Sequence, residues 1–428
     1  MDVYSIISLF GGLALFLYGM HTMSAGLEKL SGSKLQSTLQ KMTAHTSTSL
    51  IFGAAITIAI QSSSALTVML VGLVNSGIMQ LEQTVSVILG GNIGTTLTAW
   101  ILSLSGISGD SIFINLLKPE NFSPIVALIG VIMIMACNTQ KKKDIGCVFV
   151  GFAILMYGMT LMSGSVAPLA DMPEFTGILT AFNNPFLGVL VGLVFTGIIQ
   201  SSAASVGILQ ALSLTGCITY GMAIPLVMGL NIGTCATALL SSIGTTKNAR
   251  RVAIVHITGK IIGTVFCMIV FYGLNAIIGF GFINSPLSAP EVALCHTVFN
   301  IITTIILLPA RKVLIKISRI VVRGNDAKQS EVFLDERLLL SPGLAVHESY
   351  NMAVKMSDIA RSCVLTAMGL MLSYDNDKAA DVKTEETELD MYEDKLGSFL
   401  VKLSASALSD NVSADVSKLL HNIGDFER

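Results

Sequence analysis

The chain carries the same pattern of residues twice, at a constant offset of 139 positions. The first copy contains the blocks GLALFLYGMHTMS, IQSSSA and GGNIGTT, and the second contains GFAILMYGMTLMS, IQSSAA and GLNIGTC. The matched residues are 12–24 with 151–163, 60–65 with 199–204, and 90–96 with 229–235. Three blocks in one register, without a gap, indicate an internal duplication. We therefore expect two halves of related structure.

Composition places both halves in a lipid bilayer. Of the 428 residues, 52% are hydrophobic and 13% are charged, and the mean hydropathy is +0.72. These values lie outside the range of soluble globular proteins. Residues 1–310 contain only 20 charged side chains (Asp, Glu, Lys and Arg), whereas the last 118 residues contain 34. The sequence therefore predicts an all-α polytopic membrane part followed by a polar tail.

Several classes of function find no support in the residues. A net charge of −2 offers no basic face for nucleic acid. The seven cysteines are scattered without a CxxC pair, so neither a disulfide framework nor a zinc site is indicated. The sequence also contains no P-loop, GxSxG or HExxH motif. We therefore expect neither an enzyme nor an ATP-driven pump.

Charges in the short loops predict that the two halves have opposite orientations. The first apolar span leads to lysines between residues 29 and 41, whereas its copy follows lysines at 141–143 and leads to Asp171 and Glu174. Lysine and arginine near span ends favour the cytoplasmic side. Equivalent helices that point in opposite directions are typical of inverted-topology repeats, the architecture of many secondary transporters.

The remaining apolar segments complete this membrane part. Residues 123–138, 252–282 and 291–310 are long enough, or nearly so, to cross. Within 48–104 and 187–243, Ser, Gly, Asn and Pro cut the apolar runs into short pieces. These two regions are interpreted as re-entrant hairpins or broken helices followed by a full span, although three crossings in each satisfy the charge rule equally well.

Polar residues interrupt the apolar runs at equivalent places in the two halves. Non-helical backbone at membrane depth is tolerated only where it is buried in protein or lines a watery cavity. A helix that restarts near Ala65 behind a run of serines presents free N–H groups, which suit an anion such as phosphate, and the same oxygens suit sodium. The Asn-Ile-Gly-Thr stretches predict a second pair of breaks. The expected substrate- and sodium-binding residues are Gln61, Ser62, Ser63, Ser64, Asn92, Thr95, Thr96, Gln200, Ser201, Ser202, Ser205, Asn231 and Thr234.

Isolated polar residues receive a plainer interpretation. Ser86 and Thr264 are expected to bond back to their own helices or to serve helix packing. Lys260 is expected to extend to the cytoplasmic interface, and His256 and His296 to pack between helices. Since Glu82 and Glu291 fall near segment ends, the predicted site contains no fixed charge.

With QSSSA and GGNIGTT, repeated as QSSAAS and GLNIGTC, the sequence resembles the bacterial branch of the type II sodium-dependent phosphate cotransporter family. The resemblance covers residues 1–310. It implies alternating-access import of inorganic phosphate across the cytoplasmic membrane, with sodium as the coupling ion and no other cofactor. Ala203 and Leu230 depart from the family pattern and bear on sodium number and affinity. Another oxyanion, export of phosphate, or a membrane sensor without transport are the alternatives.

The polar tail resembles a PhoU-like domain, a helical module associated with phosphate regulation. MYEDKLGSFLVKLS at 391–404 has apolar residues at helical spacing. Glu393 and Asp394 are conceivable metal ligands, but a solvated helix face is the preferred interpretation. The resemblance implies cytoplasmic phosphate-regulatory proteins as partners and a domain that is incomplete at IGDFER. The expected domains are two transport repeats at 1–138 and 139–310, a basic linker at 311–334, and this cytoplasmic domain at 335–428.

Overall fold

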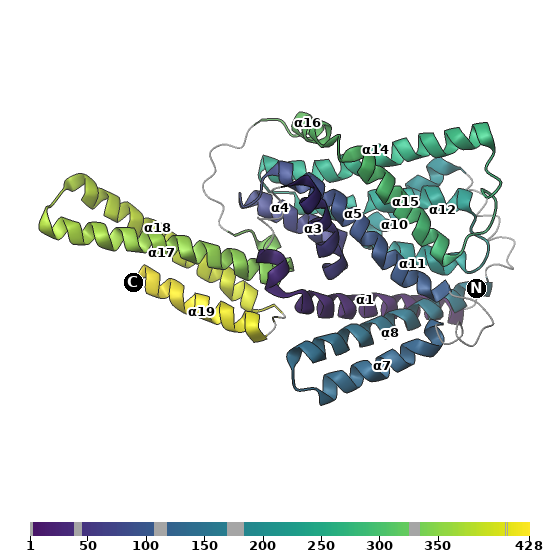
Figure 1. Cartoon of the computed structure of the whole chain (residues 1–428), viewed down its shortest axis with the longest axis horizontal. Helices are drawn as coiled ribbons and strands as arrows, with labels where there is room; N and C mark the ends of the chain where they lie inside the picture. Colours follow the sequence, from purple (N-terminus) through teal and green to yellow (C-terminus); the bar gives the residue numbers. More distant parts are fainter. Residues whose placement is uncertain are drawn as a thin grey trace. The chain divides into compact units, whose positions relative to one another are not determined.

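The computed structural model describes residues 3–37, 45–106, 118–168, 184–324, 334–406, 408 and 410–428. The regular secondary structure of the described residues is helical, apart from one isolated antiparallel bridge between Thr219 and Pro286 (Figure 1). Lys41, Asp171 and Glu174, on which part of the orientation prediction rests, lie outside the described residues.

The helices follow one another in the order α1 (Val3–Ser37), α3 (Thr46–Ile60), α4 (Ser63–Asn75), α5 (Leu81–Ser103), η1 (Leu104–Gly106), α7 (Pro119–Ala136), α8 (Gln140–Val166), α10 (Pro185–Ile199), α11 (Ser202–Ser213), α12 (Tyr220–Gly233), α13 (Cys235–Ser241), α14 (Lys247–Ile278), α15 (Ala289–Leu307), α16 (Arg311–Val321), η3 (Glu336–Leu340), α17 (Pro342–Leu372), α18 (Asn376–Ser404) and α19 (Asp410–Glu427). Six helical segments in the described chain are long and apolar enough to cross a membrane. They are Tyr4–Leu27, Leu81–Gly106, Gln140–Val166, Tyr220–Ser241, Lys247–Ile278 and Ala289–Leu307. The prediction of an all-α, multi-pass membrane protein is confirmed.

By its internal contacts the chain divides into two units. Unit 1 comprises Met1–Ser31, Lys41–Val71 and Gln80–Asp326, and unit 2 comprises Gly32–Gln40, Gly72–Met79 and Ala327–Arg428. All the predicted substrate- and sodium-binding residues belong to unit 1. By these contacts Gly72–Met79, which includes the last turn of α4, is assigned to unit 2. The helix that begins at Ser63 in unit 1 therefore ends in unit 2.

In unit 1, α3 crosses α5 so closely that glycine is required at the contact. A Cβ atom on Gly90 of α5 would overlap the carbonyl oxygen of Leu50 in α3. In the second half, a Cβ atom on Gly229 of α12 would overlap the carbonyl oxygen of Val189 in α10 in the same way. Each pair is related by the offset of 139, so the same helix crossing occurs in both halves.

Helices α1 and α8 pack against each other through glycines at reciprocal positions. Gly12 of α1 faces the backbone of Met162 in α8, and Gly151 of α8 faces the backbone of Met23 in α1. Residue 151 is the equivalent of residue 12 in the second half, and residue 162 is the equivalent of residue 23. The second contact therefore joins the same two positions as the first, with the two halves exchanged. A contact that is unchanged by this exchange is the kind that a two-fold axis generates. The two helices are antiparallel.

Unit 2 contains the long helices of the tail. The face of α18 that carries Leu389, Tyr392, Leu396, Phe399, Leu400 and Leu403 is buried, as the apolar spacing predicts. Glu393 is half-buried and Asp394 exposed. At the start of the tail, the Asp335 carboxylate accepts a hydrogen bond from Asn75 Nδ2 at 2.6 Å. The PhoU-like identity of the tail stays a prediction, as do the four domain boundaries.

Candidate functional site

The first helix of each half ends at a glutamine in a left-handed conformation. Gln61, after α3, has φ 56°, and Gln200, after α10, has φ 58°. They are the only residues other than glycine with positive φ in the described part of the chain. This conformation costs a non-glycine residue roughly 1 kcal/mol or more. Both glutamine motifs therefore break the helix, as the sequence predicts.

A serine caps the helix that restarts after each glutamine. The Ser62 hydroxyl accepts a hydrogen bond from the backbone N–H of Ala65 at 3.1 Å, and Ser201 accepts one from Ala204 at 3.2 Å. The new helices begin at Ser63 and Ser202, two residues earlier than the restart expected at Ala65. Each half thus has a helix N-terminus, with its partial positive charge, inside the apolar unit.

The two glutamine side chains differ in their surroundings. Gln61 is buried: its amide nitrogen donates to the carbonyl of Ile58 at 2.6 Å, and its amide oxygen accepts from Thr98 Oγ1 at 2.9 Å. Gln200 is exposed, and its side chain forms no hydrogen bond with the described residues. Gln61 therefore braces the break in the first half, whereas the Gln200 amide is available to a ligand.

Apart from the two capping serines, the predicted hydroxyl groups fall into two sets. Four of them donate to a carbonyl of their own helix: Thr95 to Gly91, Thr96 to Ile93, Ser205 to Ser201, and Thr234 to Asn231. The hydroxyls of Ser63, Ser64 and Ser202 form no hydrogen bond with the described residues. These three serines lie in the first turns of α4 and α11 and can donate to an anion held there.

The predicted break at Asn92 is wrong. Asn92, Thr95 and Thr96 lie inside the continuous helix α5, because the neighbouring glycines permit the close crossing with α3 and do not end the helix. In the second half Asn231 lies within α12, and the chain departs from α-helical hydrogen bonding only at Thr234, before α13. Asn92 is buried, and its side chain makes no hydrogen bond among the described residues.

Lys260 is a second correction. Its side chain is only 3% exposed and its ammonium nitrogen lies 2.8 Å from Asn231 Oδ1 and 3.2 Å from Asn300 Oδ1. The lysine lies 13 residues after the start of α14, about 20 Å along the helix at ~1.5 Å per residue. It does not extend to the protein surface as expected, because the asparagines hold its ammonium group in the interior of unit 1. A fixed positive charge therefore lies beside the second Asn-Ile-Gly-Thr stretch.

Two threonines belong to the same region although the sequence did not single them out. Thr57 and Thr196 lie one helical turn before Gln61 and Gln200, and both are buried. Neither hydroxyl has a hydrogen-bond partner among the residues that the structure describes. Threonine in a helix commonly donates to the carbonyl four residues earlier, so two equivalent threonines that do not are notable. Their common position relative to the duplicated glutamines is the signal that would have identified them.

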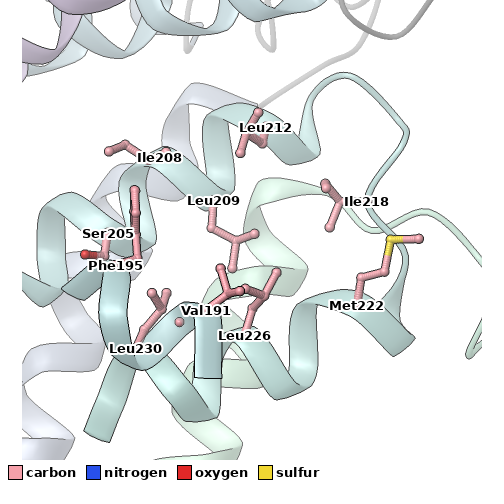
Figure 2. Close-up of a pocket in the computed structure, with 11 residues that line it drawn as sticks. Val191, Phe195, Ser205, Ile208, Leu209, Leu212, Ile218, Met222, Leu226 and Leu230 are labelled. Carbon is pink, nitrogen blue, oxygen red and sulfur yellow. The ribbon is translucent and has the colours of Figure 1, made fainter. Parts of the chain in front are cut away.

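A cavity of about 140 Å³ lies between α10, α11 and α12 (Figure 2). Side chains of Val191, Phe195, Leu209 and Leu226 line it, and Ser205 supplies the only polar side chain in the lining. A space with so few hydrogen-bond donors cannot hold an oxyanion. The candidate site is therefore at the helix starts and not in this cavity.

The four polar stretches are not joined to one another by a direct hydrogen bond within the described residues. Gln210 of α11, whose side chain is fully buried, forms one of the hydrogen-bonded connections between the two halves. Its amide nitrogen donates to the carbonyl of Ala99 in α5 at 2.9 Å and to that of Ala289 in α15 at 3.0 Å. The described residues also contain no group of three or more His, Cys, Asp or Glu side chains arranged to hold a metal ion.

Comparison with known proteins identifies the family. The model of the Na+/Pi-cotransporter family matches residues 15–164 and, a second time, residues 154–289. The uncharacterized protein YqeW of Bacillus subtilis is 28% identical over 305 residues, which cover 71% of this chain and 94% of YqeW. No solved structure matches.

Two further relatives have names that state a function. The "Putative inorganic phosphate export protein YjbB" of Escherichia coli is 24% identical over 361 residues, covering 83% of this chain and 63% of YjbB. The human "Sodium-dependent phosphate transport protein 2B" is 30% identical over 141 residues, covering 33% of this chain and 19% of that protein. On the match of the family model, this chain belongs to the Na+/Pi-cotransporter family, whose members are transporters and not enzymes.

Proposed function

We propose that the protein is a sodium-coupled symporter that imports inorganic phosphate by alternating access. The observation that carries the proposal is the pair of left-handed glutamines, Gln61 and Gln200, each followed by a helix N-terminus in an apolar unit. Two strained breaks at equivalent positions serve no purpose in a membrane anchor. They suit a transporter, in which substrate sites lie at broken helices of the two repeats.

The chemistry of the two breaks suits phosphate and sodium together. The N-termini of α4 and α11, with the free hydroxyls of Ser63, Ser64 and Ser202, offer donors to an oxyanion. The free amide oxygens of Asn92 and Gln200 are hard ligands of the kind that sodium accepts. We propose these residues as the binding groups, together with Thr57 and Thr196.

Export of phosphate is the second candidate, because the relative named as an export protein aligns with 83% of this chain. Both directions use the same site, and the sodium gradient decides between them. Symport down an inward sodium gradient carries phosphate into the cell, whereas export against that gradient cannot be driven by sodium that moves in the same direction as phosphate.

Uptake of radiolabelled phosphate into proteoliposomes tests the function. We expect uptake to accelerate when sodium outside exceeds sodium inside, and to fall to the level of protein-free liposomes when choline replaces sodium. Liposomes preloaded with phosphate measure efflux in the same preparation. Sodium-independent efflux without uptake would favour the exporter, and competition by sulfate or arsenate would show how far the site accepts other oxyanions.

We also propose that the two halves are inverted in the membrane and that the tail is cytoplasmic, in the cell's cytoplasmic membrane. The reciprocal antiparallel contact of α1 and α8 supports the inversion, since a two-fold axis parallel to the membrane plane reverses the direction of a helix. The family model, which matches each half separately, is consistent with a duplicated unit.

Cysteine accessibility tests this orientation. In a background without the seven native cysteines, we expect Lys34→Cys to react with a membrane-impermeant maleimide only from the cytoplasmic side. Asp171→Cys should react only from the outside, because the lysines near 34 favour retention in the cytoplasm and the acids near 171 do not. Labelling of both positions from one side would contradict the inversion.

A further inference from the structure

Lys260 is a buried positive charge for which the described chain supplies no carboxylate. The salt bridges in the described residues join Arg319 to Glu82, Arg337 to Asp335, and Lys402 to Glu336, and none includes Lys260. An ammonium group removed from water and bound only to neutral amides is expensive to bury. A residue of this kind within a membrane part marks a functional site, and a missing negative charge has to come from elsewhere.

The two asparagines that hold Lys260 are oriented for a cation. Asn231 Nδ2 donates to the carbonyl of Val227 at 2.9 Å, and Asn300 Nδ2 donates to that of His296 at 2.9 Å. These bonds turn each NH₂ group toward its own helix and leave both amide oxygens pointing at the Lys260 nitrogen. Oxygen atoms from two helices, α12 and α15, thus surround a single positive charge.

The first half lacks this arrangement at the equivalent place. Asn92 stands 139 residues before Asn231 in the duplicated Asn-Ile-Gly-Thr stretch, and both side chains are buried. Asn231 binds the ammonium, whereas Asn92 forms no hydrogen bond with the described residues. The duplication therefore has one asparagine with a built-in cation and one whose oxygen is free.

We infer that the Lys260 ammonium is a permanently attached cation that takes, in the second half, the position that a sodium ion takes at Asn92 in the first. This inference rests on the proposed function, because it assigns sodium and phosphate to the same unit. The ammonium supplies positive charge for the anion but does not cross the membrane with it. The site at Asn92 then couples one sodium ion to transport, and the site at Asn231 couples none. If both asparagines bound sodium, two sodium ions would be coupled.

Sodium titrations of the full-length protein test the inference. Lys260→Gln removes the charge and leaves the oxygens of Asn231 and Asn300 for sodium. We expect the sodium dependence of phosphate uptake to gain about one unit of Hill slope. At low sodium the apparent phosphate affinity should fall about tenfold or more, and it should recover at high sodium. Lys260→Arg keeps the charge and should keep the wild-type slope.

Thermal stability of the purified protein in sodium or choline at equal ionic strength gives a readout that needs no transport. Lys260→Gln should gain stabilisation by sodium beyond that of the wild type. Lys312→Gln, the same change at an exposed lysine of α16, is the control and should not. If Lys260→Gln does not insert, Asn300→Asp provides the second variant, because its carboxylate would neutralise Lys260 and should likewise raise the sodium requirement of uptake.

Two results would overturn the inference: sodium titrations that coincide for Lys260→Gln and the wild type, or phosphate uptake that is lost equally at every sodium concentration. The second result would make Lys260 a direct ligand of phosphate. Failure of the proposed function looks different, because wild-type liposomes would then show no sodium-driven uptake of phosphate. The stability titration would still test Lys260.

Discussion

Gly90→Ala should yield a protein that is strongly destabilised or does not insert. The added methyl group would overlap the carbonyl oxygen of Leu50, a backbone atom that can move only if α3 and α5 separate. Overpacking of this kind costs roughly 1 to 3 kcal/mol and occasionally more, which outweighs the gain of about 1 kcal/mol in helix propensity from glycine to alanine. The same loss is expected for Gly229→Ala, which would overlap Val189 in the second half.

Gly273→Ala is the matched control, since a Cβ atom on this glycine of α14 has no neighbouring atom within 4 Å. Thermal unfolding of the purified variants, followed by the fluorescence of the single tryptophan, Trp100 on α5, measures the difference. We expect Gly273→Ala to unfold at the wild-type temperature or above it. Equal stability of Gly90→Ala and Gly273→Ala would show that the α3–α5 crossing is looser than described.

Ser63→Ala and Ser202→Ala should each weaken phosphate binding at every sodium concentration. Both hydroxyls lie at a helix start and are free of partners in the described chain, so each can donate to the anion. A hydrogen bond to a charged group contributes about 1.5 to 3 kcal/mol, which corresponds to a loss of affinity of tenfold or more. Thr95→Val is the control, because its hydroxyl already donates to Gly91.

Asn92→Ala should behave differently from the serine variants. If its free amide oxygen binds sodium, the variant needs more sodium for half-maximal uptake, and additional sodium restores phosphate affinity through the linkage between the two ligands. Gln200→Ala should show the same pattern, whereas Gln61→Ala should lower stability, because Gln61 braces the break through Ile58 and Thr98. Unchanged sodium and phosphate dependence in the variants of Ser63, Ser202, Asn92 and Gln200 would show that the breaks are structural and that the site lies elsewhere.

The two glutamine breaks could be located without a structure. A glutamine followed by serines in an apolar run is costly in a regular membrane helix. Because the motif is repeated at a fixed offset, its occurrence is not a coincidence. The serine cap followed from local chemistry, since a hydroxyl at Ser62 or Ser201 can accept a hydrogen bond from the free N–H groups in the first turn of the helix that follows it. The hydropathy of the long segments likewise sufficed to predict a multi-pass helical protein.

The glycine-rich stretch around Asn92 shows where local reasoning fails. Glycine weakens an isolated helix, and on that basis the stretch predicts a break. In the folded unit, Gly90 and Gly94 allow α5 to contact the backbone of α3, and this packing stabilises the continuous helix. The α3 backbone that these glycines contact is about 40 residues away along the chain. The helix propensity of the stretch therefore cannot predict this contact.

By itself, therefore, the sequence determined the duplication, the membrane location, the two glutamine breaks and, through the motifs, the family. Tertiary structure decided which of the polar groups are free, because a serine or asparagine can bond equally well to its own helix, to a neighbour or to a ligand. It also decided the state of Lys260. A lysine in an apolar helix can extend to the interface or be buried, and the outcome depends on Asn231 and Asn300, which reach it from two other helices.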